Sequence, residues 1–145
     1  MNTRYWPEEQ NEFFKKLVGK KIIDVRGLCR GSKYVSILFE DGSAIRFYHS
    51  QSCCESVDLD DVCGDVDDLL NAKLYGIELR NNIGYQPARD CYDESYTWSF
   101  YSIRTDKGYV DLKWYGCSNG YYSETVDVEY YQPDYDNWES KFESY

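Results

Sequence analysis

The chain lacks any apolar run of membrane-spanning length, and its first ten residues hold no apolar segment of the kind that signal peptides carry. It is also poor in basic residues, with 16 Lys and Arg against 26 Asp and Glu and a formal net charge of −10. Because duplex nucleic acid and anionic membranes bind basic surfaces, this balance disfavours both as partners. These absences predict a cytoplasmic protein.

Spaced cysteine pairs and glycine-rich phosphate loops are absent as well. The six cysteines, at positions 29, 53, 54, 63, 91 and 117, form no C-x-x-C pair and suggest no disulfide framework, so we expect them to be reduced. Neither G-x-G-x-x-G nor a P-loop occurs in the sequence. We therefore expect no metal and no cofactor.

Aromatic residues, in contrast, are abundant: they make up 18% of the 145 residues, with sixteen Tyr and four Trp. Aromatic side chains favour strands and offer large, partly polar contact surfaces. A chain of this length fits a single domain over residues 1–145, with a core over about 16–130 and an acidic, aromatic C-terminal extension over 131–145. The composition favours an α+β fold that is mainly β.

Local patterns place the individual elements. Pro7 opens an N-terminal helix that Gly19 closes, and the apolar face of this helix is expected to hold Phe13, Phe14, Leu17 and Val18. Asp41-Gly42 is a strong hairpin turn between two strands. The expected strands are 21–26, 34–39, 43–49, 74–80, 96–104, 109–115 and 121–130, and a short second helix is expected over 65–70 in the acidic segment 57–68. Together they predict an antiparallel meander, strongly curved or barrel-like.

The first concentration of site-like residues follows the hairpin, where a strand ends and polar, chemically varied side chains gather. Its candidate ligand-binding residues are His49, Gln51, Cys53, Cys54, Glu55 and Ser56. Three other interpretations stay open: a hydrogen-bonded core histidine, a zinc site, and a Cys–His nucleophile pair. No third catalytic partner and no zinc-ligand spacing is visible, so we expect no catalytic residue here.

The second concentration surrounds the turn pair Asn119-Gly120. Rings lie beside amide and hydroxyl groups there, an arrangement that suits a planar, hydrogen-bonding ligand such as a nucleobase. Its candidate ligand-binding residues are Trp114, Tyr115, Ser118, Asn119, Tyr121, Tyr122 and Ser123. Arg46 and Arg104 are the cations we expect to contact an anionic group of the same ligand.

Two motifs carry a family resemblance: Cys53-Cys54-Glu55-Ser56-Val57 and Ser118-Asn119-Gly120-Tyr121-Tyr122-Ser123-Glu124. With the pattern around Leu17 to Leu28, the chain over about residues 16–129 resembles a family of small phage and bacterial proteins that share a domain of unknown function. The resemblance implies a phage setting, and with it a protein that counters host defence and assembles as a homo-oligomer. Its place would then be the host cell cytoplasm.

Residues and resemblance together favour a non-enzymatic protein that binds and sequesters a nucleotide-derived small molecule, of the cyclic nucleotide or cyclic ADP-ribose kind. One alternative is an acidic inhibitor that binds another protein or mimics the charge of nucleic acid. The other alternative is a cysteine- or metal-dependent enzyme that acts on a nucleotide.

Overall fold

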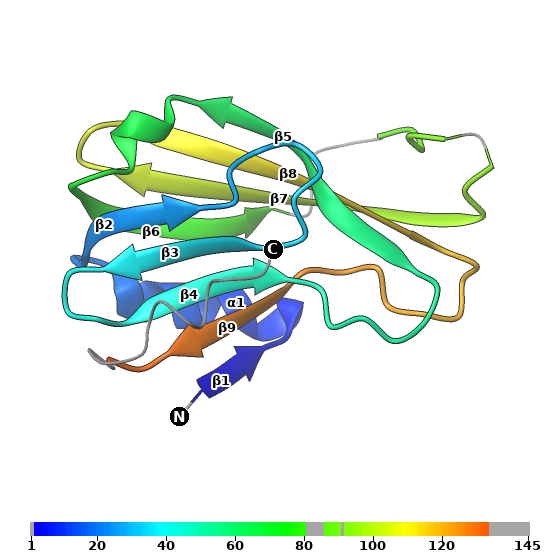
Figure 1. Ribbon diagram of the computed structural model, residues 1–145, viewed down its shortest axis with the longest axis horizontal. Helices are drawn as coiled ribbons and strands as arrows, with labels where there is room; N and C mark the ends of the chain where they lie inside the picture. Colours follow the sequence, from blue (N-terminus) through cyan, green and yellow to red (C-terminus); the bar gives the residue numbers. More distant parts are fainter. Residues whose placement is uncertain (1, 81–85, 91, 134–145) are drawn as a thin grey trace.

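The computed structural model describes residues 2–80, 86–90 and 92–133. One antiparallel sheet dominates these residues, and its strand order is β1-β9-β4-β3-β2-β6-β7-β8-β5 (Figure 1). The strands are β1 (Asn2–Tyr5), β2 (Lys21–Arg26), β3 (Val35–Phe39), β4 (Ala44–Tyr48), β5 (Ser56–Gly64), β6 (Ala72–Arg80), β7 (Ser95–Thr105), β8 (Tyr109–Ser118) and β9 (Asp127–Tyr131). The helical elements are α1 (Pro7–Phe14) and the 3₁₀ turns η1 (Lys15–Leu17) and η2 (Val66–Asp68). The expected α+β, mainly antiparallel fold is confirmed.

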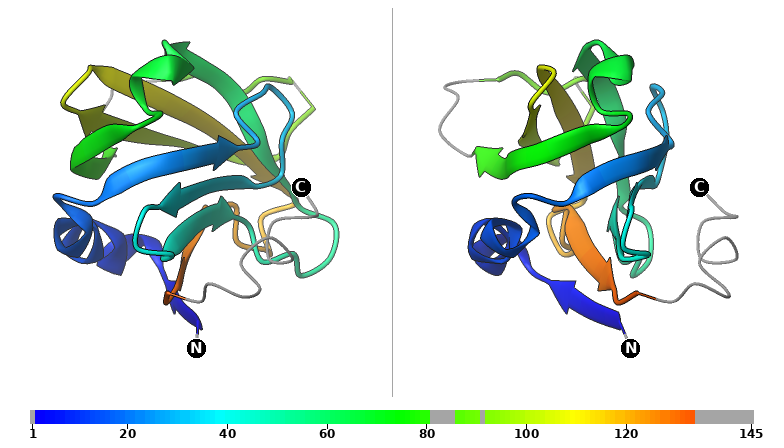
Figure 2. Two further views of the ribbon diagram at one scale, coloured as in Figure 1. Left: turned by 60° about the vertical axis from the view of Figure 1, so that its left-hand side comes forward. Right: turned by 90° about the vertical axis from the view of Figure 1, so that its left-hand side faces the viewer.

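The sheet is strongly curved but does not close into a barrel (Figure 2). Strand pairing joins its two halves where β2 pairs with β6, through Lys21 with Lys73 and Ile22 with Ala72. The outer edge of β5 meets the loop between β2 and β3, where Leu59 exchanges two backbone hydrogen bonds with Gly31 and Ser32. The curvature is as expected but the barrel-like form is not, because the two end strands of the order, β1 and β5, do not pair with each other.

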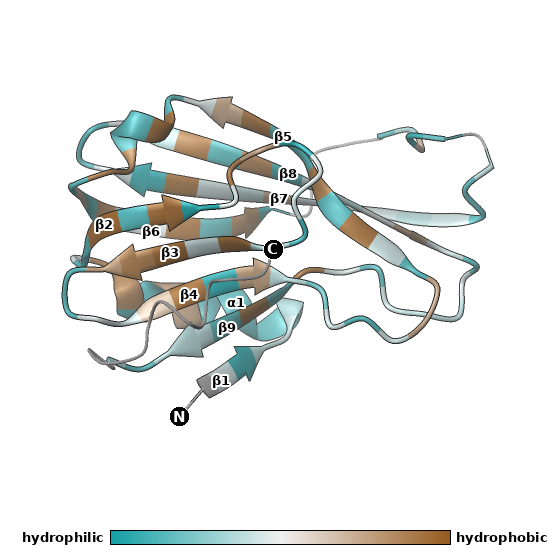
Figure 3. Ribbon diagram, viewed as in Figure 1, coloured by the Kyte–Doolittle hydropathy of each residue, from teal (hydrophilic) through white to brown (hydrophobic). Residues whose placement is uncertain are grey.

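The core lies between the two halves of the sheet and α1. Ring contacts link the three layers: the Phe47 and Tyr101 centroids are 4.9 Å apart, and those of Phe14 and Tyr101 are 6.2 Å apart. Buried Gln10 supports this contact, since its side chain accepts a hydrogen bond from the Tyr101 hydroxyl and donates to the carbonyl of Val126. Strand β3 is buried along its whole length, whereas β7 and β8 alternate apolar and polar residues (Figure 3).

The N-terminal helix differs from its expected form at its end. Pro7 begins α1 as predicted, but the α-helix ends at Phe14 and tightens into η1. Fewer residues per turn rotate the following side chain away from the apolar face. Phe13, Phe14 and Leu17 are buried as expected, while Val18 is 53% exposed.

Two strands were not predicted, and one was misplaced. The acidic segment after residue 56 is strand β5, whose Val57 and Leu59 face the core while Asp58 and Asp60 face outward. Residues 2–5 form β1, which pairs with β9. The last strand starts at residue 127 instead of 121, and the expected helix over 65–70 is only the turn η2. The extension after residue 133 lies outside the described residues, and none of the helices within them is long and apolar enough to cross a membrane.

Candidate functional site

His49 and Glu55 form a buried pair just after β4. Their side chains are 4% and 0% exposed, and His49 Nε2 lies 2.7 Å from Glu55 Oε2. The other ring nitrogen, Nδ1, lies 2.8 Å from the carbonyl oxygen of Thr125. Because the Thr125 carbonyl can only accept, Nδ1 donates to it, while Nε2 shares a hydrogen bond with the Glu55 carboxyl group. The buried pair ties the end of β4 to the segment before β9.

The Glu55 carboxylate is saturated by the loop that carries it. The backbone N–H of Ser52 donates to Oε2 at 2.9 Å, and that of Cys53 donates to Oε1 at 2.8 Å. Gln51 Nε2 donates to Oε1 and to the carbonyl oxygens of Cys53 and Glu55. Burial raises the pKa of the Glu55 carboxyl, but the hydrogen bonds from His49, Cys53 and Ser52 outweigh it and lower this pKa to about 2. Gln51 and Glu55 are thus committed to the structure of the loop.

Cys53 and Cys54 lie exposed on this loop. The structure joins their sulfur atoms in a disulfide, in contrast to the expectation that all cysteines are reduced. Cys91 lies outside the described residues; the free thiols within them are Cys29, Cys63 and Cys117. Across the described ranges, no group of three or more His, Cys, Asp or Glu side chains is arranged to hold a metal ion.

The turn after β8 is fixed by its own side chains. The Gly120 N–H donates to Ser118 Oγ at 2.9 Å, and the Tyr121 N–H donates to Asn119 Oδ1 at 3.1 Å. Ser118 Oγ in turn donates to the buried carboxylate of Glu124 at 2.5 Å. Ser118 and Asn119 therefore act as turn formers in this conformation.

The remaining candidates of this turn differ in exposure. Tyr121 is 87% exposed, whereas Tyr122 is half-buried and its carbonyl accepts a hydrogen bond from Ser118. Ser123 Oγ lies 3.0 Å from Thr125 Oγ1 on the surface. Of the candidate rings in the described chain, Tyr121 is the one that solvent reaches most fully.

The structure brings the two predicted clusters together. Ser56, the first residue of β5, pairs with Cys117 of β8, and His49 reaches the carbonyl of Thr125. The N–H of Ser50 also donates to Asp127 Oδ2 at 3.0 Å. Figure 1 shows the loops after β4 and β8 at the same end of the molecule. We call residues 49–56 and 116–127 the loop junction.

Trp114 and Tyr115 were expected to form ligand-stacking walls, but both are 0% exposed. Trp114 faces the main core, and its indole N–H has no hydrogen-bond partner within the described part of the chain. Tyr115 faces the opposite side of β8, where its hydroxyl donates to Asp93 and accepts from the Arg89 N–H. Burial and the hydrogen bond to Asp93 raise the pKa of Tyr115 to about 12. Both rings are committed to packing.

Arg89 was not predicted to have a role, yet it fastens the segment before β7 onto the sheet. Its Nη1 lies 2.8 Å from Asp58 Oδ1 and 3.2 Å from Asp60 Oδ1. Its guanidinium also lies 4.5 Å from the ring centroid of Tyr115. The hydrogen bonds that the guanidinium donates to Asp58 and Asp60 raise the pKa of Arg89 further above its ordinary value, despite partial burial. Two carboxylates of the acidic segment thereby share one cation.

The two candidate anion contacts lie far apart in the sheet order. Arg46 is on β4, where its guanidinium lies 5.0 Å from the ring of Tyr34 and 5.8 Å from that of Tyr131. Arg104 is on β7, and its Nη2 lies 3.7 Å from Glu78 Oε2 on β6. Arg104 thus belongs to a different place from the loop junction.

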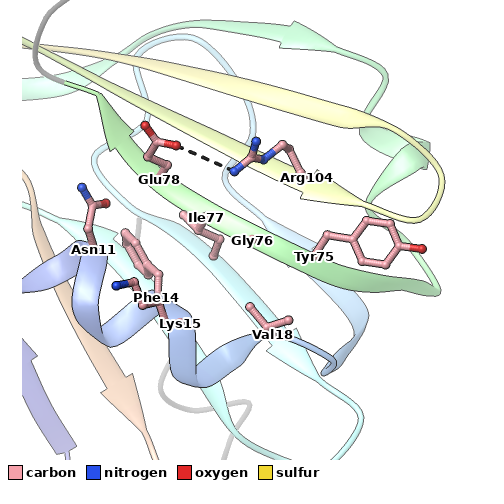
Figure 4. Close-up of a pocket in the computed structure, with 9 residues that line it drawn as sticks. All are labelled: Asn11, Phe14, Lys15, Val18, Tyr75, Gly76, Ile77, Glu78 and Arg104. Carbon is pink, nitrogen blue, oxygen red and sulfur yellow. Dashed lines mark ion pairs between the residues drawn. The ribbon is translucent and has the colours of Figure 1, made fainter.

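A cavity of about 350 Å³ lies between α1 and β6 (Figure 4). We call it the β6 cavity. Its volume lies in the range of small-molecule sites. Its nine lining residues are Asn11, Phe14, Lys15, Val18, Tyr75, Gly76, Ile77, Glu78 and Arg104.

The walls of the β6 cavity combine apolar, aromatic and cationic groups. Val18 and Tyr75 are 53% and 59% exposed at its rim. Arg104 reaches the cavity past Gly76 of β6, where an added Cβ would lie 3.6 Å from Arg104 Nη2, in ordinary van der Waals contact. Lys15 adds a second cation, which pairs on the surface with Glu12.

Of the residues that line this cavity, only Arg104 was among the candidates expected from the sequence. One available signal was Gly76 inside a strand pattern, since an isolated strand glycine marks a bulge or a close approach of another group. The structure shows the first of these, an irregularity in the β6–β7 register between Leu74 and Gly76. The helix wall gave no signal, because its approach to β6 depends on contacts distant in sequence.

These features define a class of protein: a single-helix antiparallel β domain with an open, curved sheet and a cavity where the helix meets the sheet. The matching family model is described as Domain of unknown function (DUF7448), and it covers residues 15–128. Since this is well over half of the chain, the protein belongs to that family. No curated protein and no solved structure matches it.

Proposed function

We propose that this protein binds and retains a nucleotide-derived small molecule in the β6 cavity without converting it. The observation that carries the proposal is the cavity between α1 and β6 whose walls combine an exposed ring, Tyr75, with two cations, Lys15 and Arg104. A ring stacks on a base, and the cations suit a phosphate group. The ligand class is the one expected from the sequence, but we place its binding site in the β6 cavity instead of at the loop junction.

Two features favour the cavity over the loop junction as the binding site. At the loop junction His49, Gln51 and Glu55 satisfy one another's hydrogen bonds, and the neighbouring rings of Trp114 and Tyr115 on β8 are fully buried. A ligand there would have to break existing contacts, whereas the cavity offers volume without such a cost.

The composition of the cavity wall favours binding over catalysis. Its nine lining residues include no histidine and no cysteine, and its only carboxylate, Glu78, is paired with Arg104. General acid–base or nucleophilic chemistry draws on such groups. The phage setting implied by the resemblance suits this role, because a protein that holds an immune signal by stoichiometric binding, as a homo-oligomer or alone, silences it without turnover.

The test incubates the full-length protein with a panel of cyclic nucleotides and cyclic ADP-ribose, removes the protein by ultrafiltration, and then heats the retained fraction. We expect depletion of at least one compound and recovery of the same mass after denaturation. A changed mass would overturn retention in favour of an enzyme. No depletion at all would overturn the proposal in favour of an acidic protein-binding inhibitor.

Matched variants locate the site. Arg104→Gln and Tyr75→Ala should each weaken retention by about tenfold or more, since each removes one polar or stacking contact. Arg30→Gln and Tyr121→Ala remove an exposed arginine and an exposed tyrosine outside the cavity, and should leave retention unchanged. Because the Arg104–Glu78 pair is largely exposed, Arg104→Gln should change the free energy of unfolding by less than about 1 kcal/mol. Loss of retention in Tyr121→Ala alone would move the site back to the loop junction.

A further inference from the structure

At both ends of the β6 edge that faces α1, the peptide groups are already hydrogen-bonded to groups that take the place of a neighbouring strand. Near its C-terminal end, Asn11 Nδ2 donates to the Leu79 carbonyl at 3.0 Å, and the Leu79 N–H donates to Asn11 Oδ1 at 2.7 Å. Near its start, the Gly19 N–H donates to the Leu74 carbonyl, and the Leu74 N–H donates to the Lys20 carbonyl, each at 2.8 Å. Between these two hydrogen-bonded ends, a stretch of the β6 edge remains open.

Ile77 lies in that stretch. In an antiparallel ladder the N–H and C=O of residues two apart point to the same side of the strand. Since both groups of Leu79 point away from β7 toward Asn11, both groups of Ile77 point away from β7 as well, toward α1. Within residues 2–80, 86–90 and 92–133 neither group has a hydrogen-bond partner on that side. Ile77 also lines the β6 cavity (Figure 4).

One peptide donor and one adjacent peptide acceptor therefore face the cavity. Every nucleobase has an edge with an adjacent donor and acceptor, and such an edge can pair with both groups of one residue. The apolar side chains of Phe14 and Val18 lie opposite, where they can cover a flat ring. An extended peptide needs several consecutive open residues, and the hydrogen bonds at Leu74 and Leu79 leave too few.

We infer that the peptide groups of Ile77 read the base edge of the bound nucleotide, while Arg104 holds its phosphate. The inference rests on the proposed function and assigns the recognition of the base to the open edge of β6. Removal of the Ile77 N–H alone then weakens nucleotide binding but leaves the phosphate contact intact.

The test replaces the Ile77 amide by an ester in the full-length protein, by incorporation of the corresponding α-hydroxy acid. The probes are the four nucleoside 5′-monophosphates and ribose 5-phosphate, measured by calorimetry. We expect the ester to weaken binding of the preferred nucleotide by about tenfold, and to leave the weaker binding of ribose 5-phosphate unchanged. Ile77→Val, which keeps both peptide groups, is the control and should bind as the unmodified protein does.

Amide hydrogen exchange gives an independent reading. The Ile77 amide should exchange faster than that of Glu78, which belongs to the ladder with β7, and the preferred nucleotide should slow it. Nucleotide binding that the ester leaves unchanged would overturn the inference and keep the proposed function. If no monophosphate and none of the cyclic compounds binds, both fail.

Discussion

The loop junction and the β6 cavity carry polar groups in opposite states. At the loop junction the Glu55 carboxylate accepts from His49 and from two backbone N–H groups, so its hydrogen-bonding capacity is used internally. In the cavity the peptide groups of Ile77 face empty volume. Most buried polar groups are satisfied in native proteins, and a ligand is one explanation for those that are not. The residues that stood out in the sequence stabilise the fold here, whereas the proposed site depends on residues that did not stand out.

His49→Ala should give the largest effect on stability. It removes the His49 side of the buried His49–Glu55 pair, and breaking such a buried pair costs several kcal/mol. Urea unfolding followed by tryptophan fluorescence measures it. At temperatures where the variant stays folded, its nucleotide retention per folded molecule should equal that of the unmodified protein. Reduced retention in the folded variant would contradict the separation of the two regions.

Asn11→Ala should have an intermediate effect that combines stability and binding. It removes both hydrogen bonds to the Leu79 backbone, which corresponds to about 1–3 kcal/mol. Since α1 then loses an attachment to β6, the cavity wall loosens and nucleotide retention should fall as well. The control is Asn71→Gly, which lies at a positive φ of 57° outside the cavity and should leave retention intact. Unchanged retention in Asn11→Ala would show that the helix does not form part of the site.

Acidification should act on the loop junction, with no effect at neutral pH. The Glu55 pKa is about 2 in the folded protein against 4.5 for an ordinary glutamate carboxyl. Because the unfolded chain takes up the proton at higher pH, the contribution of Glu55 is fully present above about pH 4.5 and is lost as the pH falls toward about 2. Urea midpoints of the unmodified protein and Glu55→Gln should therefore converge over this range. A constant difference between them would contradict the depressed pKa.

The sequence predicted those parts of the fold that depend on local pattern. Asp41-Gly42 forms the β3–β4 turn, with Gly42 at a φ of 88°, because only local geometry decides such a turn. Strand β5 was not among the expected strands, although Val57 and Leu59 alternate with aspartates. The alternation was the better signal.

The candidate site was harder to predict, since its chemistry comes from the backbone and from distant pairs. Asn11 and Leu79 are 68 positions apart, and nothing in either local pattern indicates that they meet. Ile77 looks like any core residue, and its side chain is indeed buried. Its open peptide groups follow from the lack of a strand on that side of β6 among the described residues, which only the three-dimensional arrangement reveals. His49 and Glu55 could be picked out from the sequence because their contribution comes from side chains, which a sequence shows directly.

The short joint between β2 and β6 has a mechanical consequence. Strand pairing joins the half-sheets through two residue pairs, so within the sheet two stiff plates share a narrow seam, and the Leu59 bonds to the loop between β2 and β3 form a second link. Twisting of one plate against the other should concentrate at this seam, because the broad ladders on either side resist it. The β6 cavity lies directly beside the seam, lined by Val18 on one side and Tyr75 on the other. A ligand bound there would contact both sides of this cavity and hold the two half-sheets together as one rigid body.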